Sequence, residues 1–132
     1  MHQTLFESDT ISLNFFKTDH LLELVWKKNP TTEEFRDIYT SAIQFAQKNK
    51  ISFFLSDMRN EGLIDMKNLK WLEKEIIPAA IKVGVKKIAM VSEESFYSTL
   101  YAEMLKKKLE NSTIQVRILS DKVEAKAWIL SN

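Results

Sequence analysis

Two runs of apolar residues near the start of the chain are typical of β-strands. Residues 11–17 and 21–27 are rich in leucine, phenylalanine and β-branched side chains, and three polar residues between them have the length of a hairpin loop. In the second run Leu22, Leu24 and Trp26 alternate with more polar neighbours, so one face of this strand should be better covered than the other. The pattern predicts an antiparallel hairpin.

Three further strands are predicted later in the chain. Residues 51–56 and 88–91 are almost wholly apolar, which suits central strands that helices cover on both faces. In the third segment, Ile114, Val116 and Ile118 alternate with their neighbours, which favours a strand at an edge of the sheet.

The first and last predicted helices have clear starting signals. A helix from about 31 to 48 begins with Thr31 and Glu34, which form the pattern of a capping box. A short final helix begins with the same pattern at Asp121 and Glu124.

Two more helices are predicted between the later strands. One runs from Asp65, its N-cap, to Gly84, its terminating residue, and Pro78 inside it predicts a kink or a break. The other covers residues 95–109, and the residues expected to point inward are Leu100, Met104 and Leu105.

The order of these elements is ββαβαβαβα, which predicts the fold class. Alternation of strands and helices indicates parallel pairing, with only the first strand antiparallel. We therefore expect a single α/β domain over residues 1–132, with one mixed, mostly parallel five-stranded sheet and about four flanking helices. Residues 1–10 are interpreted as a loosely ordered N-terminal extension.

Composition narrows the function further. The 19 basic and 18 acidic residues leave a net charge of +1, so we expect no nucleic-acid partner. The absence of cysteine suits a reducing cytoplasm. The start of the chain lacks the pattern of a secretion signal, and no apolar run approaches the roughly 20 residues of a membrane span. We expect a cytoplasmic protein.

Signals of catalysis or of a bound cofactor are weak. Only Gly62 and Gly84 occur, so the glycine-rich loops that hold phosphate groups are missing. His20 stands alone in a hairpin loop, without a second histidine at ligand spacing, and no serine lies in a nucleophile elbow. We therefore predict no metal, no cofactor and no enzyme.

Three strings resemble one family of small regulatory domains. FFLSDMR (53–59), KKIAMVSEES (86–95) and VEAKAWIL (123–130), in the predicted order of elements, are similar to the STAS and sporulation stage II protein AA-like family. The resemblance covers most of the chain from residue 11 onward. It implies the same α/β fold.

The resemblance also implies where a phosphorylation switch would lie. Anti-sigma-factor antagonists of the family carry Asp-Ser-Ser-Gly at the start of the helix after a central strand. The string LIDMKNLKWL aligns Asp65 with the Asp, Met66 and Lys67 with the two serines, and Asn68 with the glycine. Neither Met66 nor Lys67 has a hydroxyl group that accepts phosphate, so the switch should be absent.

Polar residues follow two neighbouring central strands, where ligands of open α/β sheets tend to bind. Together they would form a polar patch or a shallow cleft. The simpler interpretation is that Asp57 and Arg59 form a loop ion pair and that Ser92 or Ser95 caps a helix. The candidate binding residues are Asp57, Arg59, Asn60, Lys67, Ser92, Glu93, Ser95 and Phe96.

The sequence thus favours a non-catalytic binding or regulatory module of STAS-like type that lacks the phosphoacceptor serine. Its partner would be another protein or a second copy of the chain. An alternative is a carrier of a small apolar or lipid-like ligand, as the related Sec14-type fold would allow, and an apolar cavity would favour it. A third hypothesis is an enzyme that uses Asp57 or Glu93.

Overall fold

The structure is a computed structural model that describes residues 2–59, 66–92 and 96–131, without the side chains of residues 96–99, 101 and 102. Its strands are β1 (Gln3–Glu7), β2 (Ile11–Phe16), β3 (Leu21–Trp26), β4 (Phe53–Asp57), β5 (Lys87–Val91) and β6 (Gln115–Leu119). Its helices are α1 (Thr32–Lys48), α2 (Met66–Trp71), a π-helical turn η1 (Leu72–Ile76), α3 (Ile77–Val83), α4 (Phe96–Leu109) and α5 (Lys122–Ile129).

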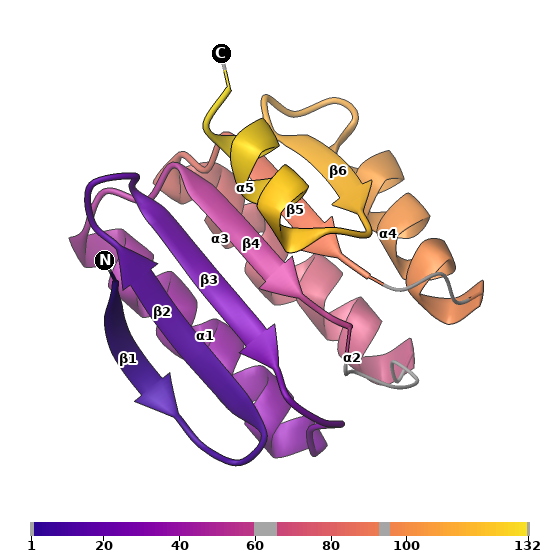
Figure 1. Cartoon of the computed structure of the whole chain (residues 1–132). Helices are drawn as coiled ribbons and strands as arrows, with labels where there is room; N and C mark the ends of the chain where they lie inside the picture. The colour runs from indigo at the N-terminus through magenta and orange to yellow at the C-terminus, as the bar shows by residue number, and fades with distance from the viewer. Residues whose placement is uncertain (1, 60–65, 93–95, 132) are drawn as a thin grey trace.

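The described strands form one mixed sheet in the order β1-β2-β3-β4-β5-β6 (Figure 1). The pairs β1/β2 and β2/β3 are antiparallel, and the pairs from β3 to β6 are parallel. The predicted α/β class, with an antiparallel start and a mostly parallel remainder, is confirmed. The predicted number of five strands is wrong, because residues 3–7, within the presumed loose extension, pair with β2 as a sixth strand.

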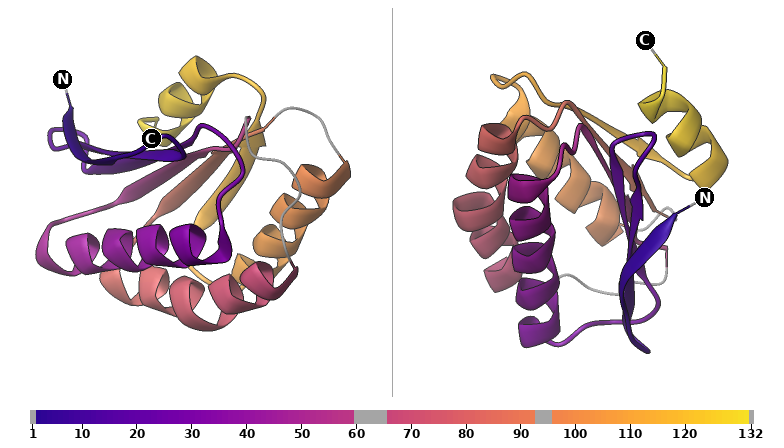
Figure 2. Two further views of the ribbon diagram at one scale, coloured as in Figure 1. Left: turned by 90° about the horizontal axis from the view of Figure 1, so that it is seen from below. Right: turned by 90° about the vertical axis from the view of Figure 1, so that its left-hand side faces the viewer.

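Helices cover the two faces of the sheet unequally. Figure 2 shows α1, the segment from α2 to α3, and α4 on one face, whereas α5 alone of the described helices lies on the other. The larger apolar core lies under α1, α3 and α4. A smaller core under α5 consists of Leu21, Leu55, Ala89, Val91, Ala125 and Ile129.

The local helix signals act as predicted in three places. The Thr31 hydroxyl accepts the Glu34 N–H while the Glu34 carboxylate accepts the Thr31 N–H, which completes the capping box. Gly84 ends α3 with a positive φ of 90°, a conformation that glycine adopts without steric cost. Asp121 caps α5 through a hydrogen bond from the N–H of Val123.

The interruption predicted near Pro78 takes the form of a π-helical turn. Proline has no N–H to donate to the preceding turn, so the regular α-helical bond pattern cannot continue through residue 78. At the residue immediately before Pro78, the N–H of Ile77 bonds to the carbonyl of Leu72, five residues back. The segment from α2 to α3 therefore continues as a helix with one widened turn.

One predicted core position is wrong. Leu100 on α4 is 50% exposed, whereas Met104 is half-buried and Leu105 is buried, as expected. The basic residues 106–108 occupy the last turn of α4, where their positive charges interact favourably with the helix dipole.

Candidate functional site

At the carboxyl end of β4, two hydrogen bonds join the side chains of an ion pair. Asp57, the last residue of β4, is only 3% exposed. Arg59 binds it with two hydrogen bonds, from Nε to Oδ1 at 2.9 Å and from Nη2 to Oδ2 at 2.7 Å. Burial raises the pKa of Asp57, but the hydrogen bonds and charge of Arg59 outweigh burial, and the pKa lies below its ordinary value. The loop ion pair that the simpler interpretation predicts is therefore present.

A second buried carboxylate lies next to this pair. Glu23, in the middle of β3, is 3% exposed and accepts a hydrogen bond of 3.0 Å from the amide of Asn14 on β2. Lys122 of α5 lies 3.1 Å from Glu23 and 3.7 Å from Asp57, measured from Nζ to the nearest carboxylate oxygen. Lys126, one turn further along α5, lies 3.5 Å from Glu23. The four residues Glu23, Asp57, Lys122 and Lys126 form what we call the α5 charge cluster.

Ionisation of Glu23 is favoured despite its burial. Burial raises the pKa of Glu23, but the hydrogen bond from Asn14 and the charges of Lys122 and Lys126 lower it, and the net shift is downward. Glu23 is not among the candidate residues named from the sequence, because it lies in the middle of a strand and ligands of α/β sheets tend to bind at strand ends. A signal was present: Glu23 is the one charged residue of the strand LLELVW.

Ser92 is buried at the neighbouring strand end. Its backbone N–H donates to the carbonyl of Leu119 at 3.0 Å, which extends the pairing between β5 and β6. Asp57 pairs in register with Val91, so the ends of β4 and β5 are neighbours. Asn60, Glu93 and Ser95 lie outside the described residues. Phe96 is the first residue of α4, and its side chain lies outside the described part.

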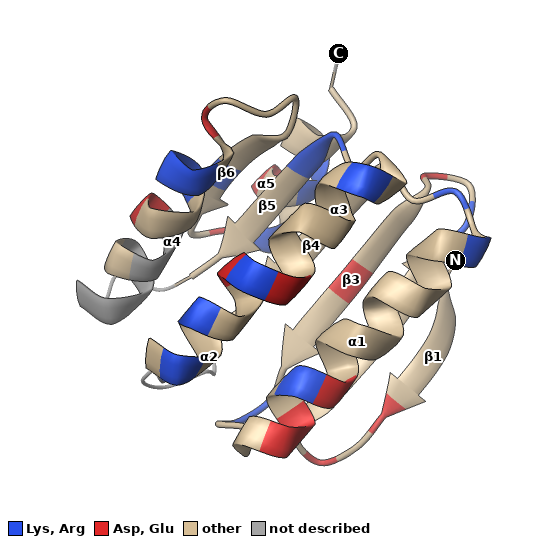
Figure 3. Cartoon of the chain, turned by 180° about the vertical axis from the view of Figure 1, so that it is seen from behind, with Lys and Arg blue, Asp and Glu red and all other residues tan. Residues whose placement is uncertain are grey.

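The start of α2 presents an exposed surface with mixed apolar and basic character. Met66 is 55% exposed, and Lys67 and Lys70 are also exposed. Trp71 is half-buried, and the guanidinium of Arg36 from α1 lies 5.5 Å from the centre of its ring. We call Met66, Lys67, Lys70, Trp71 and Arg36 the α2 face. Figure 3 shows basic residues along α2 and α4.

Buried residues hold the α2 face in place. Asn68 and Leu69 of α2 are buried beneath it. The ring of Trp71 lies 6.4 Å from that of Phe35, which stacks on Trp26 at 5.6 Å. These contacts tie α2 to the core, so the exposed side chains of its first turn stand on a rigid support.

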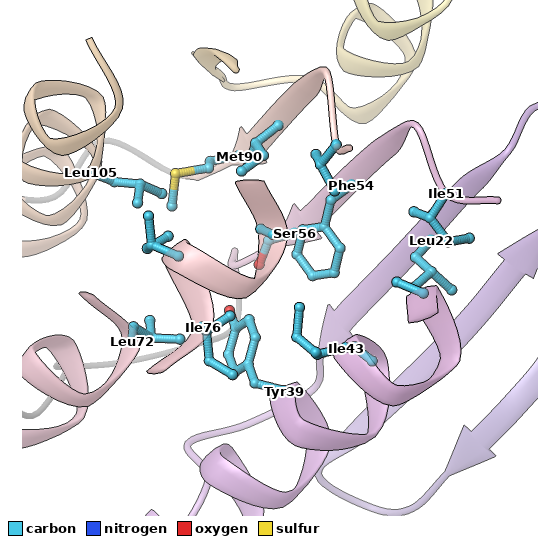
Figure 4. A pocket seen from close by; sticks show the side chains of 16 residues that line it. Leu22, Tyr39, Ile43, Ile51, Phe54, Ser56, Leu72, Ile76, Met90 and Leu105 are labelled. Carbon is cyan, nitrogen blue, oxygen red and sulfur yellow. The ribbon is translucent and has the colours of Figure 1, made fainter. Parts of the chain in front are cut away.

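An apolar cavity of about 60 Å³ lies between the sheet, α1 and the segment from η1 to α3 (Figure 4). It is smaller than the roughly 300 Å³ at which sites for larger organic ligands begin. Most of its lining is apolar, but Ser56 of β4 also lines it. The Ser56 hydroxyl is buried and has no hydrogen-bond partner among the described residues.

Neither a metal-ligand cluster nor a membrane-spanning helix is found in the described ranges. No cluster of three or more acidic or histidine side chains is placed to hold a metal ion among these residues. None of the described helices has both the length and the apolar character that crossing a bilayer requires. His20 adopts a positive φ of 54° in the hairpin loop, a backbone role that needs no ligand.

Comparison with known proteins identifies the fold. No protein-family model and no curated protein matches the chain. Among solved structures, the chain is similar to an uncharacterized protein of the DUF3478 family from Shewanella loihica PV-4, which has a SpoIIAA-like fold. The two share 14% sequence identity and a TM-score of 0.61, over 98% of this chain and 92% of that one. Identity this low establishes the fold and leaves function open. The chain therefore has a SpoIIAA-like fold, in agreement with the resemblance of its sequence.

Proposed function

We propose that this protein is a non-catalytic binding module of STAS-like type, and that it binds another protein through the α2 face. The observation that carries the proposal is the exposure of Met66 and Lys67 in the first turn of α2, at the positions aligned with the two serines. This protein would thus have an apolar and basic contact surface that is always available, in place of a surface whose binding is switched by phosphorylation of a serine.

The chemistry of the α2 face suits a protein partner. Methionine, tryptophan and arginine are enriched in protein interfaces, and tryptophan and arginine dominate binding energy where they are well supported. Lys67, Lys70 and Arg36 contribute three positive charges, and the first turn of α2 has no acidic residue. The partner surface expected from this charge has an apolar centre with an acidic rim.

The state of Asp57 supports a non-catalytic role. A general acid needs a pKa near the working pH, whereas the pKa of Asp57 is lowered and both its oxygens are bonded to Arg59. The carrier of a lipid-like ligand is less favoured than the binding module, because the apolar cavity is too small for such a molecule. We place the protein in the cytoplasm because the sequence has no cysteine.

Site-specific photo-crosslinking tests the proposal. A photoreactive amino acid is introduced in place of Met66 and, as a control, in place of Val123, which is even more exposed, at 75% against 55%, and lies on α5. In cells of the source organism, we expect a discrete adduct from position 66 and none from position 123. Charge reversal by Lys67→Glu with Lys70→Glu should remove the adduct, because the acidic rim of the partner would be repelled.

The control for charge reversal is Lys82→Glu with Lys86→Glu, because both of these lysines are exposed and lie away from α2. This control should leave the adduct unchanged. An adduct with the mass of two copies would identify the partner as the chain itself. Absence of any adduct at position 66, or equal adducts at 66 and 123, would contradict the proposal.

A further inference from the structure

The Ser56 hydroxyl is the unusual feature of the apolar cavity. Ser56 lies in β4 between Phe54 and Met58 on the same face of the strand, and it is 2% exposed. Its Oγ has no hydrogen-bond partner in the described part of the chain. Most buried hydroxyl groups have such a partner, and a buried polar group without one destabilises a fold. A ligand would supply the missing bond.

Small side chains line the same cavity as this hydroxyl. Ala42 and Ala46 of α1 and Ala80 of α3 all line the cavity. A larger apolar residue at any of these positions would fill the space, as in an ordinary close-packed core. The π-helical turn η1 contributes Leu72 and Ile76 to the same wall.

The lining also determines which molecules the cavity accepts. Among the described lining residues none is charged, so a charged ligand would lose its hydration without compensation. Figure 4 shows the hydroxyl groups of Ser56 and Tyr39 pointing toward the same part of the cavity. Its volume of about 60 Å³ is roughly that of two water molecules in the liquid, so a ligand of about two or three non-hydrogen atoms fits.

We propose that this cavity is a binding site for a small uncharged organic molecule with an apolar body and one hydroxyl or carbonyl group. The apolar body contacts the alanine and isoleucine side chains, and the polar group forms a hydrogen bond with Ser56 Oγ. The inference concerns a site beneath α1 and is independent of the α2 face.

The test compares two probes of the same shape. Methanol has the hydroxyl group, whereas fluoromethane replaces it by fluorine, a poor hydrogen-bond acceptor, and both are small enough for the cavity. Each probe is titrated into the full chain labelled at methionine methyl groups and followed by NMR. Met90 lines the cavity and should report binding, whereas Met66 on the surface serves as an internal control.

We expect a saturable shift of the Met90 signal with methanol. Because the two probes differ in hydration, their affinity ratio is compared between proteins. In Ser56→Ala the affinity of methanol relative to fluoromethane should fall about fivefold, as the loss of one buried hydrogen bond predicts. Ala80→Met should abolish binding of both by filling the cavity, and Ala46→Met serves the same purpose if that variant does not fold.

Three results would overturn the inference. These are the absence of a saturable Met90 shift with methanol, an affinity ratio of the two probes that is the same in Ser56→Ala as in the unaltered chain, and unchanged binding of both probes in Ala80→Met. Because none of these measurements involves the α2 face, their failure would leave the crosslinking result unaffected.

Discussion

The ammonium group of Lys122 lies 3.1 Å from the carboxylate of Glu23, and this contact ties the C-terminal helix to the middle of the sheet. The same ammonium group lies 3.7 Å from Asp57, so one lysine of α5 is shared by two buried carboxylates. At the other end of α5, the Nζ of Lys87 donates to the carbonyls of Trp128 and Ser131. Polar contacts at both ends therefore fix α5 over its small apolar core.

Glu23→Gln should destabilise the fold by about 2 kcal/mol, because Lys122 and Lys126 would lose a buried partner. Urea unfolding measures the change. Glu7→Gln is a matched control, since Glu7 forms an ion pair with Lys27 in an exposed position and its removal should cost less than about 0.5 kcal/mol. Equal effects of the two substitutions would show that the α5 charge cluster contributes no more than a surface pair.

The pKa values of Glu23 and Asp57 predict a loss of stability in acid. Both lie below the ordinary values of 4.5 and 3.8, so each folded carboxyl group holds its proton less tightly than in the unfolded chain. The stabilisation is complete above those ordinary values and decreases as the pH falls through the lower folded pKa values.

Denaturant unfolding at a series of pH values below neutrality checks this dependence. Glu23→Gln removes one of the two groups, so the free energy of unfolding of the variant should fall less steeply with decreasing pH. If the free energy of unfolding changes equally with pH in the variant and in the unaltered chain, the pKa of Glu23 is the same in the folded and the unfolded state.

Ser56→Ala should leave the ligand-free fold equally stable or stabilise it by up to about 1 kcal/mol, because it removes a buried hydroxyl that has no described partner. Thermal and urea unfolding measure the effect. A loss of more than about 1 kcal/mol would show instead that Ser56 Oγ makes a bond within the folded chain.

Local signals predicted much of the fold. Thr31 with Glu34, Gly84 and Pro78 each act through their own backbone neighbourhood, and each of them marks a real start, end or interruption of a helix. β1 was missed because its residues are mostly exposed, and only pairing with β2 holds them in a strand. The expectation that Leu100 points inward is wrong because helical spacing shows which side of α4 faces the core but not how far along α4 the core extends.

The candidate site was only partly predictable. Asp57 and Arg59 are two residues apart, so their ion pair follows from local sequence. By contrast, Glu23 and Lys122 meet only because β3 lies beside β4 and α5 crosses the sheet there. Ser56 also could not be singled out from the sequence, because whether its hydroxyl finds a hydrogen-bond partner depends on every element that packs around it.

The most direct test of the central claim, that the α2 face binds a protein partner, uses the absence of cysteine from the chain. Met66→Cys and Val123→Cys each provide a single thiol, which is labelled with the same environment-sensitive dye. The partner recovered by crosslinking is then titrated into both proteins. The account predicts a saturable fluorescence change from position 66 and none from position 123. A change from position 123 alone, or no change at either position despite binding, would contradict it.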